Sequence, residues 1–377
     1  MKFSCDSQTL QKGIGIVEKA ISSRTTVPVM ENIFFDIRDH QLRLRGNDLE
    51  IGIETSIPIE SLGQNGSFLI KGKTISSIVS KIYNQPLNIS VNDSNKVIIK
   101  TDHVDFDIHG TSVEEYPAFP NIEEGTRLSF SSADLRGLIK NTIFSVSFDE
   151  TKQFLNGVYI KNEEDYIYFV STDGYRLSLR RMQIAKPDKD FAVIVPYKAL
   201  NELYKILQQV DAETKVDVTI SASQISFLMP NFVLVARLVQ GQFPDYRQVI
   251  PSSSENVLTL SRRTFIDASE RAYIIASSSN NVVRLSFSDA ELTLKANSPT
   301  LGDFKETVEI TRQKGSLHAN IAFNVRLILE AIKNIETDLI QIEFNGELSP
   351  CIIRPLQDED YTYIIMPIRT SDYHQST

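Results

Sequence analysis

The sequence predicts an α+β protein built from three copies of one domain, each with two helices packed on an antiparallel sheet. Two repeated patterns and a background of short alternating strands lead to this prediction. The repeat of about 125 residues is far longer than the roughly 20–45-residue units of solenoid proteins, so we expect three whole domains. The joins are expected in polar, turn-rich segments, which gives domains at 1–125, 126–253 and 254–377.

The first repeated pattern is a short strand, a polar cluster and a helical segment, and it opens each copy. It begins at Phe3, Leu128 and Leu258 with the sequences FSCDSQTL, LSFSSADL and LTLSRRTF. An overlooked repeat would lead to a wrong fold prediction. The repeat therefore determines the expected number of domains before any single motif is considered.

The second repeated pattern is a strand followed by a helix, found in SFLIKGKTISSIVSKI, AVIVPYKALNELYKIL and NIAFNVRLILEAIKNI. In the first copy, the apolar residues Ile75, Ile78, Val79 and Ile82 follow the spacing of one helix face. Runs such as IFFDI, YIYFVS and VVRLSF read as strands between polar turns. Each copy is therefore expected to hold two helices and about eight strands.

The composition, 41% hydrophobic and 23% charged, is that of a soluble globular protein. No run of about 18 apolar residues occurs, which excludes a membrane-spanning helix. The beginning MKFSCDSQTLQKG lacks the apolar core of a secretory signal, so we expect a cytoplasmic protein. The two cysteines, Cys5 and Cys351, make neither a disulfide framework nor a zinc site.

Motifs for catalysis or cofactor binding are incomplete. The GKT at 72–74 has Ser67 where a phosphate loop needs glycine, and the GIG at 13–15 is followed by Glu18 instead of a third glycine. None of the five histidines has a helix-spaced metal partner, and no G-x-S-x-G turn occurs. We therefore predict no catalytic residue, metal or cofactor. An enzyme using polar groups in a domain cleft remains the alternative.

The charge pattern indicates a binding surface rather than a catalytic site. The net charge is −9, yet a base precedes the second helix of every copy at Lys73, Lys198 and Arg326, and Arg24 follows the first helix. One interpretation is a solvated helix face. The other is a basic surface that follows DNA phosphates without reading bases. A sequence-specific DNA binder would need a recognition helix, and none is evident.

Four segments carry a resemblance to a known family: SSRTTVPVMENI, STDGYRLSL, GQFPDYRQVIP and the near-terminal YIIMPIR. They resemble the bacterial sliding clamps, the beta subunits of the replicative DNA polymerase, along the whole chain. The resemblance implies the DNA-clamp fold, a head-to-tail dimer of three-domain subunits that closes as a ring. It also implies a non-enzymatic processivity factor that encircles duplex DNA topologically and without sequence preference.

The resemblance further implies partners and sites. The partners are the catalytic subunit of the replicative polymerase, the clamp loader, and other polymerases and repair enzymes that carry a short clamp-binding motif. The bases found in the charge pattern, Arg24, Lys73, Lys198 and Arg326, are then expected to face DNA. The dimer contacts are Phe106, Ile108, Ile274 and Ile275. The peptide pocket comprises Leu155, Thr172, Gly174, Tyr175, Arg176, Leu177, Pro244, Val249, Ile364, Ile365, Met366, Pro367, Ile368 and Arg369.

Some positions leave the prediction open. From the residues alone, Ile364-Ile365-Met366 could equally be a last strand within a core. Gln248 stands where the family commonly has a base, which makes the pocket rim less positive. Tyr197 and Asp149 replace residues that approach DNA in relatives, so we expect no DNA contact from them. The residues after Arg369 receive no predicted role.

Overall fold

The computed structural model describes residues 1–22 and 27–369. The chain divides into two compact units. The first consists of Met1–Asp134 and Lys198–Leu238, and the second of Leu135–Tyr197 and Val239–Thr377. In the described part of the chain, no helix is both long and apolar enough to cross a membrane.

The described residues of the first unit form two antiparallel sheets. The five-stranded sheet has the order β5 (Glu60–Ser61), β1 (Lys2–Asp6), β7 (Pro86–Val91), β8 (Lys96–Lys100) and β9 (Asp105–His109). The eight-stranded sheet has the order β10 (Thr126–Ser131), β15 (Lys215–Ile220), β16 (Gln224–Met229), β17 (Phe232–Arg237), β4 (Ile51–Pro58), β3 (Gln41–Asn47), β2 (Asn32–Arg38) and β6 (Gly66–Lys71).

In the second unit, the part of the chain up to residue 369 likewise forms two antiparallel sheets. The nine-stranded sheet has the order β14 (Ala192–Pro196), β11 (Gly157–Glu163), β12 (Tyr166–Thr172), β13 (Arg176–Gln183), β26 (Tyr361–Ile365), β25 (Cys351–Pro355), β24 (Leu339–Phe344), β18 (Asn256–Ser261) and β22 (Thr311–Lys314). The four-stranded sheet has the order β21 (Gly302–Glu309), β20 (Glu291–Ser298), β19 (Val282–Phe287) and β23 (Ala319–Asn324).

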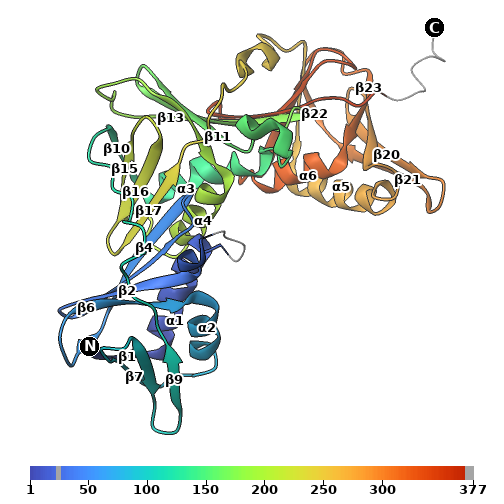
Figure 1. The fold of residues 1–377 in the computed structure, drawn as a ribbon. Coiled ribbons are helices and arrows are strands. Elements are labelled where there is room, and N and C mark those ends of the chain that lie inside the picture. The colour runs from blue at the N-terminus through green and yellow to red at the C-terminus, as the bar shows by residue number, and fades with distance from the viewer. Residues whose placement is uncertain (23–26, 370–377) are drawn as a thin grey trace. The chain divides into compact units, whose positions relative to one another are not determined.

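Within the described residues, each sequence repeat supplies two α-helices, as predicted, and the α+β class with antiparallel sheets is confirmed. The helices are α1 (Ser7–Val17), α2 (Gly72–Val79), α3 (Ser132–Lys140), α4 (Tyr197–Leu207), α5 (Arg262–Ala276) and α6 (Val325–Lys333). Helices α1 and α2 contact each other, and α5 and α6 lie side by side (Figure 1).

The polar residue between strand and helix caps the helix. The Asp6 carboxylate accepts a hydrogen bond of 2.9 Å from the Thr9 amide at the start of α1, and the Ser261 hydroxyl accepts one from Thr264 at the start of α5. Such a side chain satisfies an amide that has no partner inside the helix. The helix starts are therefore determined by local sequence.

The helix ends differ from the sequence prediction. Helix α2 ends at Val79, before Ile82, although Ile82 is buried. Helix α6 ends at Lys333, before the buried Ile335, which is the last residue of the predicted strand-and-helix segment NIAFNVRLILEAIKNI. Burial of an apolar side chain just beyond a helix extends the periodic pattern, so periodicity alone overestimated both lengths.

The second repeat is divided between the two units. Its strands β15–β17 continue the sheet of the first repeat, whereas β11–β14 belong to the sheet that also holds β24–β26. Strand β13 pairs with β26, which places Leu177 opposite Ile364. The compact units therefore do not follow the linear repeats, and the three domain boundaries remain a prediction.

Candidate partner-binding pocket

A tight turn between β12 and β13 is built by the TDGYR sequence. Gly174 has a φ of +92°, a backbone conformation that residues with a side chain rarely adopt. The Asp173 carboxylate accepts hydrogen bonds from the amides of Tyr175 (2.9 Å) and Arg176 (3.0 Å), and the Thr172 hydroxyl donates to the Arg176 carbonyl (2.6 Å). The turn therefore positions Arg176 and Leu177 at the start of β13.

Next to this turn lies a small apolar cavity with a volume of about 210 Å³. Its floor includes Leu177 and Ile364, which are 3% and 1% exposed, and its mouth includes Val249 and Met366, which are 40% and 37% exposed. Its lining consists of Leu155, Thr172, Gly174, Arg176, Leu177, Pro244, Asp245, Tyr246, Val249, Ile364 and Met366. An apolar concavity with a few polar groups suits a short apolar segment.

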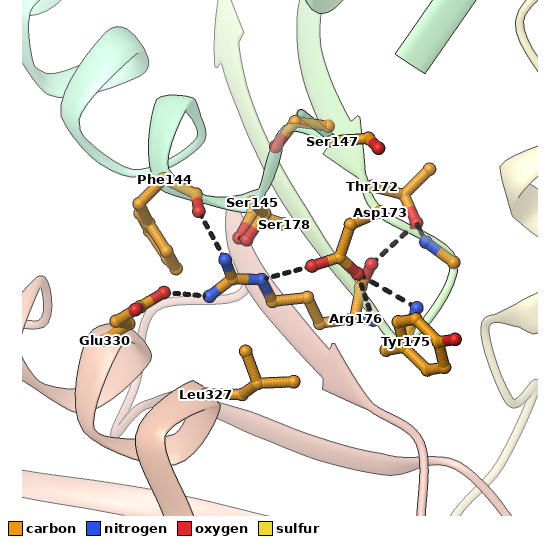
Figure 2. Close-up of polar contacts among 12 residues, drawn as sticks. Phe144, Ser145, Ser147, Thr172, Asp173, Tyr175, Arg176, Ser178, Leu327 and Glu330 are labelled. Carbon is orange, nitrogen blue, oxygen red and sulfur yellow. Dashed lines mark hydrogen bonds and ion pairs between the residues drawn. The ribbon is translucent and has the colours of Figure 1, made fainter. Parts of the chain in front are cut away.

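One wall of the cavity is the nearly buried Arg176, whose guanidinium has three partners (Figure 2). It donates to Asp173 at 3.0 Å, to the Phe144 carbonyl at 2.7 Å, and to Glu330 on α6. Burial acts to lower the pKa of Arg176, but Tyr363, Glu330 and Asp173 outweigh burial and raise it. The arginine is therefore a fixed, charged part of the wall.

Glu330 connects this wall to an exposed base. Its carboxylate also accepts a hydrogen bond of 3.0 Å from Arg326, four residues earlier on α6. Sequence reasoning missed Glu330 and Asp173. The i, i+4 spacing of Arg326 and Glu330 could have indicated that pair, but the contact with Arg176 joins residues 154 apart and leaves no local signal.

The structure brings together nine of the fourteen residues predicted for the pocket, and five lie outside its lining. Tyr175 is 71% exposed, and Ile365 is buried in the core of the third repeat. Met366 donates its amide to the Tyr175 carbonyl at 2.9 Å, which holds the C-terminal segment against the turn. Pro367 follows Met366, and Ile368 and Arg369 line a different groove.

The FPDYR sequence and the turn after it supply further lining of the cavity. The Asp245 side chain accepts from the Arg247 amide (3.3 Å) and so begins the 3₁₀ turn Tyr246–Val249. Tyr246 has a buried hydroxyl without a hydrogen-bond partner in the described structure, and burial raises its pKa to about 12. Gln248 donates to Asp245 at 3.1 Å. Asp245 and Tyr246 line the cavity, although the sequence prediction named only Pro244 and Val249 from this segment.

The predicted DNA-facing bases occupy equivalent positions. Lys73, Lys198 and Arg326 are each the second residue of their helix, α2, α4 and α6, and all are exposed. Lys198 forms an ion pair with Asp48, just as Arg326 does with Glu330. Arg24 lies outside the described residues.

Two of the departures from the family pattern have local partners. The Asp149 carboxylate accepts from the Thr151 amide at 2.9 Å, and the Thr151 hydroxyl and amide lower its pKa. The Tyr197 ring meets Phe148 edge-on with centroids 5.0 Å apart. Both residues therefore have structural contacts of their own.

The predicted dimer contacts lie on an edge strand and at a helix end. Phe106 and Ile108 are half-buried on β9, the outermost strand of its sheet. Near the end of α5, Ile274 is 65% exposed, whereas Ile275 packs partly against the core of the third repeat. Within residues 1–22 and 27–369, no group of three or more His, Cys, Asp or Glu side chains could hold a metal ion.

The fold defines a class of protein with three repeated α+β domains whose helices pack on antiparallel sheets. Sequence models of the DNA polymerase III beta subunit match all three parts of the chain: the N-terminal domain at residues 1–120, the central domain at 129–245 and the C-terminal domain at 247–369.

Relatives agree along the whole length. The chain is 33% identical to the beta sliding clamp of Bacillus subtilis (strain 168) over 380 residues, covering 98% of this chain and 100% of the relative. It is 32% identical to the beta sliding clamp of Staphylococcus aureus (strain Mu50) over 360 residues, covering 93% and 95%. The crystal structure of the B. subtilis DNA polymerase sliding clamp matches with a TM-score of 0.91 and 32% identity, covering 98% and 99%.

The chain belongs to the DNA polymerase III beta subunit family, the beta sliding clamps. This confirms the resemblance found in the sequence and the three-domain clamp fold. It also supports function as a clamp-type processivity factor in DNA replication.

Proposed function

We propose that two copies of the chain close head to tail into a ring that encircles duplex DNA. The observation that carries this proposal is a pair of edge strands, β9 at the end of the five-stranded sheet and β21 at the end of the four-stranded sheet. An edge strand presents backbone groups that can pair with another chain. Pairing β9 of one copy with β21 of the other would use both edges, with Phe106, Ile108, Ile274 and Ile275 as the apolar contact.

The bases on the helices support sequence-independent contact with the DNA backbone. Lys73, Lys198 and Arg326 lie in the first turn, at the positive end of the helix dipole, where a base is unfavourable for the helix. For Lys73 and Lys198, helix stability therefore does not explain the position, and for Arg326 the pair with Glu330 only offsets the dipole effect. Attraction to phosphates would account for all three. Arg24 is proposed to act with them. In two cases a phosphate would replace a carboxylate, Asp48 or Glu330, so the contacts stay weak enough for sliding.

The cavity is proposed to bind peptides of the Gln-x-x-Leu-Phe type. Leu177, Ile364, Val249 and Met366 would contact the leucine and phenylalanine, and Tyr175, Ile365, Pro367, Ile368 and Arg369 would extend or support the rim. The partners would be the catalytic subunit of the replicative polymerase, the clamp loader, and other polymerases and repair enzymes. The protein would act in the cytoplasm without catalysis or a cofactor, as three domains at 1–125, 126–253 and 254–377.

The pocket is tested by calorimetry with such a peptide. A dissociation constant near the micromolar range, about 10⁻⁶ M, is expected from the small buried area. Met366→Ala should weaken binding about tenfold, because the side chain lies at the mouth. Leu348→Ala, at an exposed leucine outside the lining, is the matched control. Equal binding to Met366→Ala and wild type would place the peptide site elsewhere.

Truncation is a poor test of the pocket. Ile364 and Ile365 belong to β26, which lies between β13 and β25 inside the nine-stranded sheet. Deleting residues 364–377 would remove the end of a central strand, so a loss of binding would not separate the pocket from the fold. Point substitution at Met366, which lies just past the strand, avoids this difficulty.

Ring closure is tested by sedimentation. The wild type should sediment at twice the 42.6 kDa mass of one chain. Ile274→Asp should give monomers, because a carboxylate would be buried in the interface. Ile275 is a less suitable target because it also packs against the core. A monomeric wild type at micromolar concentration would contradict the proposed ring.

A further inference from the structure

Three basic residues lie directly opposite one another on three adjacent strands of the four-stranded sheet. Arg284 on β19 is paired in register with Lys295 on β20, and Lys295 with Lys305 on β21. All three side chains are exposed. Their strand neighbours Leu285 and Leu294 point to the buried face, which α5 covers, so the bases lie on the face away from the helices.

This arrangement is unfavourable for the isolated sheet. Side chains directly opposite each other have Cβ atoms about 5 Å apart, and like charges at that distance destabilise the pairing. Lys295 and Lys305 have no side-chain ion pair or hydrogen bond within residues 1–22 and 27–369. Within the described part of the chain, Lys295 and Lys305 therefore lie opposite each other without a compensating acid, in a protein whose net charge is −9.

The row lines a groove with a volume of about 860 Å³, whose other charged residues are Arg369 and Asp303. Asp303 accepts a hydrogen bond from the Asn297 amide group. The next carboxylates on the same face, Glu291 and Glu309, lie four residues further along their strands, about 13 Å away. Bases therefore outnumber acids in the groove.

The groove adjoins the peptide pocket along the C-terminal segment. Ile364 and Met366 line the pocket, and Ile368 and Arg369 line the groove. The Ile368 amide donates to the Ala322 carbonyl at 2.7 Å, and Ala322 is the register partner of Arg284. The three residues from Met366 to Arg369 span at most about 10 Å. The three strand spacings from Ala322 on β23 to Lys305 on β21 add about 14 Å. Some seven extended residues would bridge the two sites.

We propose that this basic groove binds an acidic segment flanking the clamp-binding motif of a partner protein. The inference rests on the proposed peptide pocket and adds a second contact to it. The motif supplies the apolar anchor, and acidic residues beside it meet Lys295, Lys305, Arg284 and Arg369. The acidic remainder of the protein repels the same segment elsewhere. The charge contact therefore also determines the orientation in which the peptide lies across the pocket and the groove.

The test compares three peptides: the motif alone, the motif with a seven-residue acidic extension, and the motif with the same extension as glutamine and asparagine. Each extension is placed in turn on either side of the motif. The acidic extension on one side should tighten binding about tenfold at low salt, as expected for a few exposed charge pairs together. The gain should shrink as salt rises.

Lys295→Gln with Lys305→Gln should remove the gain and leave the affinity for the motif alone unchanged. The matched control, Lys186→Gln with Lys189→Gln, changes the net charge equally at exposed lysines outside the groove and should keep the gain. If acidic and neutral extensions bind equally, or if the gain survives loss of Lys295 and Lys305, the inference is wrong.

Two further outcomes are distinguishable. If the motif alone does not bind, the proposed pocket fails rather than the groove. If a single-stranded oligothymidylate binds through Lys295 and Lys305 while the acidic extension gives no gain, the groove binds nucleic acid and the assignment to an acidic peptide is overturned.

Discussion

Replacing Glu330 by glutamine tests how the pocket wall is held. Glu330 is one of three partners of the Arg176 guanidinium, and Arg176 is only 8% exposed (Figure 2). Glutamine keeps the size and an acceptor oxygen but removes the charge. The remaining partners, Asp173 and the Phe144 carbonyl, should keep the arginine in place but less firmly.

The magnitude follows from the contacts. A hydrogen bond between charged groups contributes about 1.5–3 kcal/mol. The Glu330 side chain is 31% exposed, so water partly replaces the lost interaction, and the lower end of this range applies. The second bond of Glu330, to the exposed Arg326, adds about 0.3–0.5 kcal/mol. We therefore expect Glu330→Gln to lower the free energy of local opening of β13 and α6 by about 2 kcal/mol.

The assay is hydrogen exchange of the β13 and α6 amides, with calorimetry of the clamp-binding peptide alongside. Local exchange is preferable because a chain with two compact units need not unfold in one step. Protection in β13 should fall and the peptide should bind several-fold more weakly. Asp267→Asn, which breaks the exposed pair with Arg263 on α5, is the control and should change stability by less than about 0.5 kcal/mol. If the two variants behave alike, Glu330 does not support the pocket.

Other predictions concern buried and titrating groups. Burial raises the pKa of the Cys5 thiol to about 12 and that of Cys351 further, so neither should react with iodoacetamide at pH 8 until the protein unfolds; prompt labelling of the native protein would contradict this. Tyr363→Phe removes a hydrogen bond of 2.9 Å to a main-chain oxygen of α6 and should lower the free energy of local opening there by about 1 kcal/mol, whereas unchanged hydrogen-exchange protection of the β26 and α6 amides would argue against the contact. The hydrogen bond from Arg271 lowers the pKa of Glu306, so its stabilising effect is present above the ordinary value of 4.5 and is lost as the pH falls through the folded value. Arg271→Gln should therefore reduce the drop in melting temperature between pH 7 and pH 3, and an equal or larger drop would oppose this reasoning.

Local sequence determines much of the fold and part of the site. The helix caps at Asp6 and Ser261 and the glycine turn at Gly174 depend on neighbouring residues, so a periodic or motif-based analysis finds them. The three equivalent bases were found in the same way, because each follows a strand and opens a helix. Their carboxylate partners, Asp48 and Glu330, were not predicted from the sequence.

Long-range strand pairing accounts for what the sequence did not reveal. Two interpretations of Ile364-Ile365-Met366 were open. The core strand holds for Ile364 and Ile365, which are both buried on β26. Ile364 and Met366 also line the cavity, whose role as a peptide pocket stays a prediction. Alternation along β26 sends neighbouring side chains to opposite faces, but only the pairing of β13 with β26 decides what each face meets. No local pattern encodes that pairing.

The central claim is topological linkage to DNA, and retention on circular DNA tests it most directly. The protein is loaded with a clamp loader onto nicked circular DNA, freed of unbound protein by gel filtration at moderate salt, and the DNA is then cut once. A ring should stay with the circle and leave once the DNA is linear, because the phosphate contacts alone are too weak to hold it. Equal retention on circular and linear DNA would contradict the encircling ring.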